Sequence, residues 1–253
     1  MAEKNQLINQ NIKRIKKNIY ETEYSSFTEV LHKNNIPYCM DSGVLLALMR
    51  DGKVFDHEKD VDLQMWSGHK DRVIELIPEF KSKGWKVTIW LYKGLIYQFR
   101  VERSDKIPVH IMLFRKYKDW AWCPAGKAIG NPASFKIGKK FYSGFVNIRR
   151  KLRNRFIITD VSRWPWKVRR VLATWWIPAE FYEHTVYNEK FKIYVPQQWD
   201  KYLKYRYGDW RVPAEKWDFW VDDGAINNKR PEELVDFSMF PKCSPKDIKK
   251  LIY

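Results

Sequence analysis

The sequence predicts an α+β protein, with a mixed sheet flanked by helices and a helical, basic and Trp-rich C-terminal part. Apolar residues recur every three or four positions over residues 4–34 and 69–83, which is typical of amphipathic helices. Short apolar or alternating segments between and after them favour strands. With 253 residues, of which 45% are hydrophobic, the chain is long enough to bury the core of one large domain.

Two helices are expected within residues 1–35, and they end before Pro37 because the residue that precedes a proline avoids helical geometry. Residues 36–115 are expected to form the core. Gly52 and Gly84 favour the ends of its two helices. The expected strands span 36–40, 60–65, 85–91, 96–102 and 109–114, and the expected helices span 44–50 and 69–83.

Residues 116–253 are expected to extend the same domain, because no repeat or low-complexity linker divides the chain. Basic side chains are dense between Lys136 and Arg170, where we expect helices anchored by aromatic residues such as Phe156. A further helix is expected to start at Pro196 and to end at Gly208, since proline suits the first turn of a helix and glycine its end. We therefore predict a single domain over residues 1–253.

The chain is strongly basic. Lys and Arg outnumber Asp and Glu by 47 to 30, which gives a formal net charge of +17. Such a charge attracts polyanions, so the expected partners are nucleic acid, an anionic membrane surface, or phosphate-bearing small molecules and glycolipids. The stretch around Arg149, Arg150 and Arg153 is expected to bind phosphate or anionic lipid, or to form a solvated helix face. Charge alone does not choose among these partners, and solubility is the simplest alternative.

The sequence contains no apolar run long enough to cross a membrane, and its start lacks the apolar core of a signal peptide. Its three cysteines do not form a CxxC pair. We expect a cytoplasmic protein, with a peripheral contact with an anionic membrane as a further expectation.

The residues expected to carry chemistry lie in the segment from Asp41 to Trp66. Ser42 and Gly43 lead into a helix, whose free backbone N–H groups favour an anion such as phosphate. Asp60 and Asp62 are two residues apart, so on a strand they share one face. Two carboxylates suit Mg²⁺, which completes its coordination with substrate phosphates. Taken singly, each feature also fits an ordinary turn or a solvent-facing edge strand.

In their order, these residues resemble the signature of the LicD and fukutin family. The signature is a glycine followed by paired leucines, an arginine, a glycine and an acidic strand, here Gly43, Leu45, Leu46, Arg50, Gly52, Glu58, Asp60 and Asp62. A second segment, VPQQWDKYLKYRYGDWRVP, is similar to a later segment of the family through Tyr207, Gly208, Asp209 and Trp210. Together the two matches bracket residues 38–213.

The resemblance implies a nucleotidyltransferase-like fold and a single catalytic domain. It implies Mg²⁺- or Mn²⁺-dependent transfer of phosphocholine, ribitol phosphate or glycerol phosphate from a CDP-linked donor to a glycan or glycolipid, as in cell-surface polysaccharide biosynthesis. Nucleic acid is then not an expected partner. The implied roles are metal binding for Asp60 and Asp62, the phosphate-side turn for Ser42 and Gly43, and a supporting position for Arg50.

Several further groups near the C-terminal end are candidates for binding substrate. Arg211 and the pair Asp222 and Asp223 are expected at the acceptor side. Tryptophan rings stack on sugars in some proteins but more often fill the core. The tryptophans in question are Trp175, Trp176, Trp210, Trp217 and Trp220.

One position departs from the family pattern, because the third carboxylate that such folds use is missing. The strand expected to carry it reads PVHIMLF and offers Met112 or, in another register, His110. We predict that His110 accepts the proton of the acceptor hydroxyl, since imidazole titrates near neutral pH. Glu58 is the next candidate base. Two other functions stay open: nucleotidyl transfer to RNA or another acceptor, and a catalytically inactive basic binding module.

Overall fold

The structure of the protein, a computed structural model, describes residues 24, 26–126, 156–160 and 171–251. Residues 26–33 are helical. The strands that follow in the described part are β1 (Cys39–Met40), β2 (Val61–Trp66), β3 (Lys86–Tyr92), β4 (Leu95–Glu102), β5 (Val109–Tyr117), β6 (Trp120–Gly126), β7 (Phe156–Asp160), β8 (Val171–Pro178), β9 (Thr185–Asn188), β10 (Ile193–Pro196) and β11 (Ile226–Asn227). The helices are α2 (Ser42–Asp51), η1 (Ser67–His69), α3 (Lys70–Glu75), α4 (Ile77–Ser82), α6 (Glu180–Glu183), α7 (Trp199–Tyr207), α8 (Pro231–Leu234), η4 (Phe237–Met239) and α9 (Pro245–Lys250).

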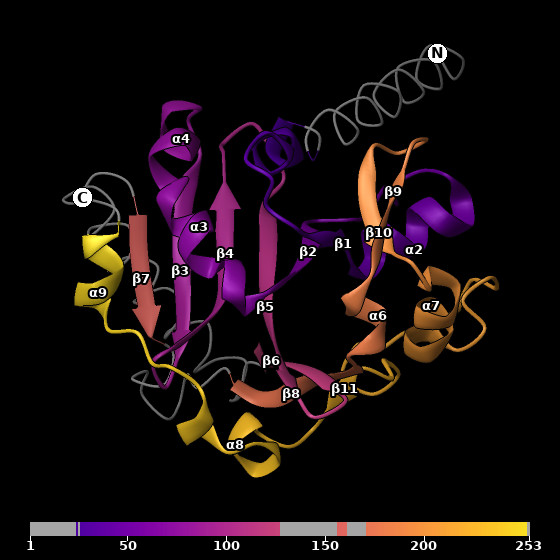
Figure 1. Cartoon of the computed structure of the whole chain (residues 1–253). Coiled ribbons are helices and arrows are strands. Elements are labelled where there is room, and N and C mark those ends of the chain that lie inside the picture. Colours follow the sequence, from indigo (N-terminus) through magenta and orange to yellow (C-terminus); the bar gives the residue numbers. More distant parts are fainter. Residues whose placement is uncertain (1–23, 25, 127–155, 161–170, 252–253) are drawn as a thin grey trace, which may run out of the picture.

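A mixed sheet of nine strands forms the centre of the described part, in the order β11-β8-β6-β5-β4-β3-β7, with β2 paired to β5 and β1 paired to β2 (Figure 1). β2 runs parallel to the first part of β5, whereas β4 and β6 run antiparallel to it. β5 is therefore the strand on which the N-terminal and C-terminal parts of the sheet meet.

The two faces of the sheet differ in polarity, because successive side chains of a strand point to opposite faces. One row of cross-strand neighbours is apolar and fully buried: Leu63, Ile111 and Phe99. The neighbouring row points to the other face and is polar and only half-buried: Asp62, His110 and Arg100. The helix α4 packs on β3, in front of the sheet in Figure 1, and its buried Ile77 and Phe80 join the apolar core.

The C-terminal elements return to the N-terminal ones. The hairpin of β9 and β10 lies beside β1, and α7 packs against β10 (Figure 1). Segments that are more than a hundred residues apart in sequence thus meet around the start of α2.

The predicted fold class, a mixed sheet flanked by helices, is confirmed. The strands expected at 85–91, 96–102 and 109–114 are present, and α2 is capped by Gly52, whose φ of 68° lies in the left-handed region that favours glycine. One expected helix is divided, because Leu76 separates α3 from α4. Pro78 explains the break, since it has no N–H to donate to the preceding turn and its ring clashes with that turn.

Other boundaries also differ from the prediction. The strand expected at 36–40 shortens to β1, and Asp60 comes immediately before β2 and not within it. The C-terminal part, expected to be helical, contributes strands to the main sheet. Phe156 begins the strand β7, where β-branched Ile157, Ile158 and Thr159 favour extended backbone.

The rest of the basic stretch, with Arg149, Arg150 and Arg153, lies outside the described residues, as do residues 1–23 of the expected N-terminal helices. Among the helices of the described ranges, none combines the length and the apolar character that crossing a membrane requires.

Candidate active site

The acidic residues predicted from the sequence lie beside the start of α2. β1 pairs antiparallel with β2, so the residue that follows β1 meets the residues that begin β2. The backbone N–H of Asp41 donates to the carbonyl of Asp62 at 3.0 Å. The turn of Ser42 and Gly43 therefore starts next to the two predicted metal ligands.

Glu58 belongs to the same cluster. Its carboxylate lies directly against Gly43, where a Cβ atom would come within 2.5 Å of Oε2. A side chain at position 43 would thus collide with Glu58 unless the carboxylate moved. The glycine of the predicted turn thus lets the Glu58 carboxylate approach the start of α2 closely.

The register between β2 and β5 decides which residue of β5 faces the aspartates. Asp62 is the cross-strand neighbour of His110, whereas Met112 lies opposite Gln64. Nδ1 of His110 is 3.5 Å from Oδ2 of Asp60 and 3.4 Å from Oδ1 of Asp62. Of the two candidates for the position of the missing carboxylate, His110 is therefore the one beside the pair.

The side chains of the cluster are partly accessible to solvent. The side chains of Asp60 and Asp62 are 37% and 26% exposed, and that of His110 is 15% exposed. Nε2 of His110 is buried and has no hydrogen-bond partner in the described part of the chain. The ring thus presents Nδ1 to the carboxylates and turns its other nitrogen into the protein.

The carboxylates of the cluster repel one another. Burial, together with the charges of Asp60 and Asp62, raises the pKa of Glu58 to about 7. Burial and the charge of Asp62 also raise the pKa of Asp60, although the nearby His110 and Arg100 oppose this shift. The site consequently favours a proton or a cation.

The donor set fits a magnesium ion that is bound together with substrate. Within the described residues, no group of three or more His, Cys, Asp or Glu side chains is arranged to hold a metal ion. Mg²⁺, however, is commonly bound through one or two carboxylates, and waters and substrate phosphates fill its other positions. Asp60 and Asp62 match that pattern.

Replacing Glu58 with glutamine is expected to stabilise the metal-free protein near pH 8 but not near pH 4. The pKa of Glu58 is about 7 in the folded protein, against an ordinary value of 4.5, so the folded state binds this proton more tightly than the unfolded chain does. The contribution of Glu58 to the free energy of unfolding is therefore fully present below pH 4.5 and is lost as the pH rises through about 7. For this partly exposed group the loss should be about 1 kcal/mol, after allowance for solvent screening.

Thermal unfolding with EDTA at both pH values measures this effect, and Glu75→Gln, at an exposed position on α3, is the control. Equal melting temperatures of the Glu58→Gln variant and the unmodified protein near pH 8 would contradict the expected repulsion.

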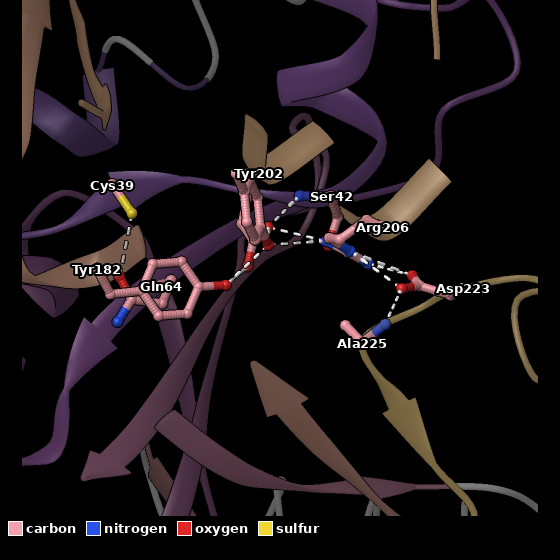
Figure 2. Close-up of polar contacts among 9 residues, drawn as sticks. Cys39, Ser42, Gln64, Tyr182, Tyr202, Arg206, Asp223 and Ala225 are labelled. Carbon is pink, nitrogen blue, oxygen red and sulfur yellow. Dashed lines mark hydrogen bonds and ion pairs between the residues drawn. The ribbon is translucent and has the colours of Figure 1, made fainter. Parts of the chain in front are cut away.

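A buried network joins the start of α2 to the C-terminal part (Figure 2). Asp41 accepts hydrogen bonds from the hydroxyl groups of Tyr182, at 3.0 Å, and Tyr202. It also accepts one from the guanidinium of Arg206 at 2.8 Å, and the same guanidinium pairs with Asp223. Burial raises the pKa of both phenols well above the usual range, so they remain donors.

The sequence interpretation did not include Asp41, Tyr182, Tyr202 or Arg206 among the site residues. The sequence did offer a reason to consider Asp41, because this residue directly precedes the Ser42–Gly43 turn. Arg206 directly precedes the Tyr-Gly-Asp-Trp motif, but nothing in the sequence pairs it with an aspartate 165 residues earlier.

No family model matches this chain. Among curated proteins, an uncharacterized protein of Rickettsia typhi is 30% identical over 91 residues. The aligned part is 36% of this chain and 27% of the length of that relative. The chain therefore matches only about a quarter of the relative, and the relative's name states no activity.

Among solved structures, the crystal structure of the lincosamide antibiotic adenylyltransferase LnuA, with lincomycin bound, is similar over 40% of this chain and 60% of that chain. The TM-score is 0.32 and the sequence identity 15%. A likeness at this level supports no conclusion about the site, which rests on its geometry.

Each of the two arginines predicted to bind substrate pairs with a nearby carboxylate. Arg50 is in the last turn of α2, about 12 Å along the helix axis from Ser42. It pairs with Asp51 at 2.9 Å and stacks on Phe55, which belongs to the loop that leads back to Glu58. Arg50 thus supports the loop that carries Glu58.

Arg211 follows α7, where it pairs with Asp200 and lies 4.4 Å from the centre of the Trp210 ring. Asp223 is buried against Arg206, and Asp222 accepts a hydrogen bond from the backbone of Asp218. Each of the three residues predicted at the acceptor side therefore contacts a different protein partner: Arg211 contacts Asp200, Asp222 contacts Asp218, and Asp223 contacts Arg206.

The five tryptophans singled out from the sequence differ in burial, and two of them, Trp176 and Trp220, are half-buried against the core. Trp175 and Trp210 are buried, and Trp176 stacks on Trp120. Trp217 is 40% exposed and packs against Tyr207 at the end of α7. Of this set, Trp217 has the ring surface that a sugar could reach.

Proposed function

We propose that this protein is a transferase of the nucleotidyltransferase type. It moves a phospho-alcohol from a CDP-linked donor to a hydroxyl group of a glycan or glycolipid, and the reaction depends on Mg²⁺ or Mn²⁺. The observation that carries the proposal is the meeting of Asp60, Asp62 and His110 beside the start of α2. The resemblance of the same segment to the LicD and fukutin signature supports the choice of donor.

The donor diphosphate is proposed to lie between the start of α2 and the aspartates. Backbone N–H groups of the first turn attract phosphate oxygens, and Ser42 and Gly43 carry no bulky side chain of their own. Asp60 and Asp62 would hold the divalent ion, which supplies neutralisation of the diphosphate charge and of the leaving group. Positioning and charge neutralisation account for most of the rate of such a transfer.

The acceptor hydroxyl attacks the phosphorus next to the alcohol, and a new oxygen–phosphorus bond forms on the acceptor. The bond from that phosphorus to the oxygen shared with the cytidine phosphate breaks, so CMP leaves. The proton of the hydroxyl passes to a base of the cluster. His110 is the proposed base, because its Nδ1 lies at the acidic cluster, 3.5 Å from Oδ2 of Asp60 and 3.4 Å from Oδ1 of Asp62. Glu58, with a pKa of about 7, is also suited to proton transfer at neutral pH.

The test is release of CMP by the full chain from CDP-choline, CDP-ribitol or CDP-glycerol, with Mg²⁺ and a panel of glycan acceptors. We expect one donor to give CMP together with a phosphorylated acceptor, and EDTA to stop the reaction. Release of pyrophosphate from CTP or ATP in place of CMP would instead indicate nucleotidyl transfer. Absence of both products with every donor would indicate a binding module.

A further inference from the structure

The side chain of Arg206 is almost completely buried, with 1% exposure, and lies between two buried carboxylates. On one side it donates to Asp41, and on the other it forms a forked pair with Asp223. A buried guanidinium of this kind is too enclosed to contact substrate. Its effect on the site must pass through its neighbours.

The connection to the site runs through Asp41. This residue caps α2, and its Oδ1 accepts hydrogen bonds from the backbone N–H of Ser42 at 2.6 Å and from Arg206. Arg206 also donates to the hydroxyl of Ser42 at 3.2 Å. One guanidinium thus holds both the cap and the first residue of the helix (Figure 2).

Ser42 needs this support because its backbone is strained. Its φ is 56°, in the left-handed region that residues other than glycine seldom adopt. A conformation of this kind persists only where its surroundings impose it. Here the contacts from Asp41 and Arg206 impose it at the turn beside the acidic cluster.

The other side of Arg206 is held rigidly. Asp223 accepts a hydrogen bond from the N–H of Ala225 at 2.9 Å, and the N–H of Gly224 donates to the carbonyl of Arg206 at 2.9 Å. The guanidinium carbon lies 4.5 Å from the centre of the Trp175 ring. The C-terminal part therefore fixes where the guanidinium stands.

We propose that Arg206 is a positioning residue. Through Asp41 and Ser42 it imposes the strained start of α2, and so sets the orientation of the first turn beside the acidic cluster, where the donor phosphates are proposed to bind. The role in donor binding rests on the proposed function, whereas the effect on the start of α2 is a property of the free protein. The C-terminal part thereby completes a site whose acidic residues all come from the N-terminal half.

Arg115 offers a matched control. Its side chain is also buried, it donates to the carbonyl of Leu113 at 3.1 Å, and it lies over the Trp122 ring. It stands about 17 Å along β5 from His110. Substituting lysine for either arginine removes a buried guanidinium, but only Arg206 contacts the start of α2.

The first measurement is hydrogen–deuterium exchange of the backbone amides of residues 42–45 in the ligand-free protein. Loss of charge-assisted bonds at the cap should make exchange there about tenfold faster in Arg206→Lys and leave it unchanged in Arg115→Lys. Equal exchange of residues 42–45 in both variants would overturn the positioning role. If Arg206→Lys does not fold, Asp223→Asn takes its place, because this change weakens the hold on Arg206 and alters no residue of α2. An unchanged exchange rate of residues 42–45 in Asp223→Asn would overturn the proposal in the same way.

The second measurement is the affinity for each of the three CDP-linked donors with Mg²⁺, by calorimetry. We expect Arg206→Lys to bind about tenfold more weakly, with Arg115→Lys binding like the unmodified protein. If the unmodified protein binds none of the donors, the proposed function fails, while the exchange experiment still decides the positioning role. If Arg206→Lys exchanges faster but binds donor normally, the start of α2 does not serve the donor and this inference is wrong.

Discussion

Asp60→Ala and Asp62→Ala are each expected to reduce transfer by about 10³-fold or more, because each would remove a ligand of the proposed divalent ion and so the neutralisation of the proposed donor diphosphate. The fold should survive both changes. Each side chain is partly exposed, so its removal leaves no cavity, and it relieves repulsion within the acidic cluster. Steady-state rates at saturating Mg²⁺, with melting temperatures measured on the same samples, check both statements.

Asp56→Ala is the control for these variants, since Asp56 lies exposed in the same loop. It should retain the rate of the unmodified protein. A near-normal turnover of Asp60→Ala or Asp62→Ala would remove the metal site from the mechanism and, with it, the central argument for this reaction.

His110→Ala is expected to lower the rate by about 10² to 10⁴-fold, the range typical of a lost general base, without weakening donor binding. The reason is geometric: β5 places the imidazole beside both aspartates, where a carboxylate could also accept the proton. For the same reason His110→Asp should keep part of the activity. Single-turnover rates and donor affinities, measured separately, distinguish loss of chemistry from loss of binding.

The comparison with Glu58→Gln assigns the base. If His110→Ala turns over normally while Glu58→Gln is inactive, the proton passes to Glu58, whose raised pKa suits it to that role. Met112→Leu is a control on the same strand and the same face, opposite Gln64, and should leave the rate unchanged.

Elements with a strong local pattern could be predicted from the sequence. The strands β3, β4 and β5 and the helix α2 appear close to their expected bounds, because side-chain periodicity and stop signals act within a few residues. The strands β6 and β8 were not predicted. Each is stabilised by pairing with the other, across some fifty residues of chain, and their tryptophans and alanines carry no clear period.

The residues of the candidate site likewise divide into those that local sequence features predicted and those that depend on contacts between distant segments. The spacing of Asp60 and Asp62 and the small turn at Ser42 and Gly43 are local features, and the structure brings all four together. Whether His110 or Met112 would join them depended on the register of two parallel strands. No tight turn connects such strands, so the sequence left both registers open.

The sequence alone was enough to predict the fold class, the acidic pair and the turn at the start of α2. Each of these features depends on residues that are neighbours in the chain. The tertiary structure decided that His110 faces the aspartates and that Arg206 meets Asp41. Those contacts arise from strand pairing and from burial of charged groups between distant segments. Burial of a guanidinium is favourable only where acceptors are in place for its N–H groups, here the carboxylates of Asp41 and Asp223, and that condition is set by the whole fold.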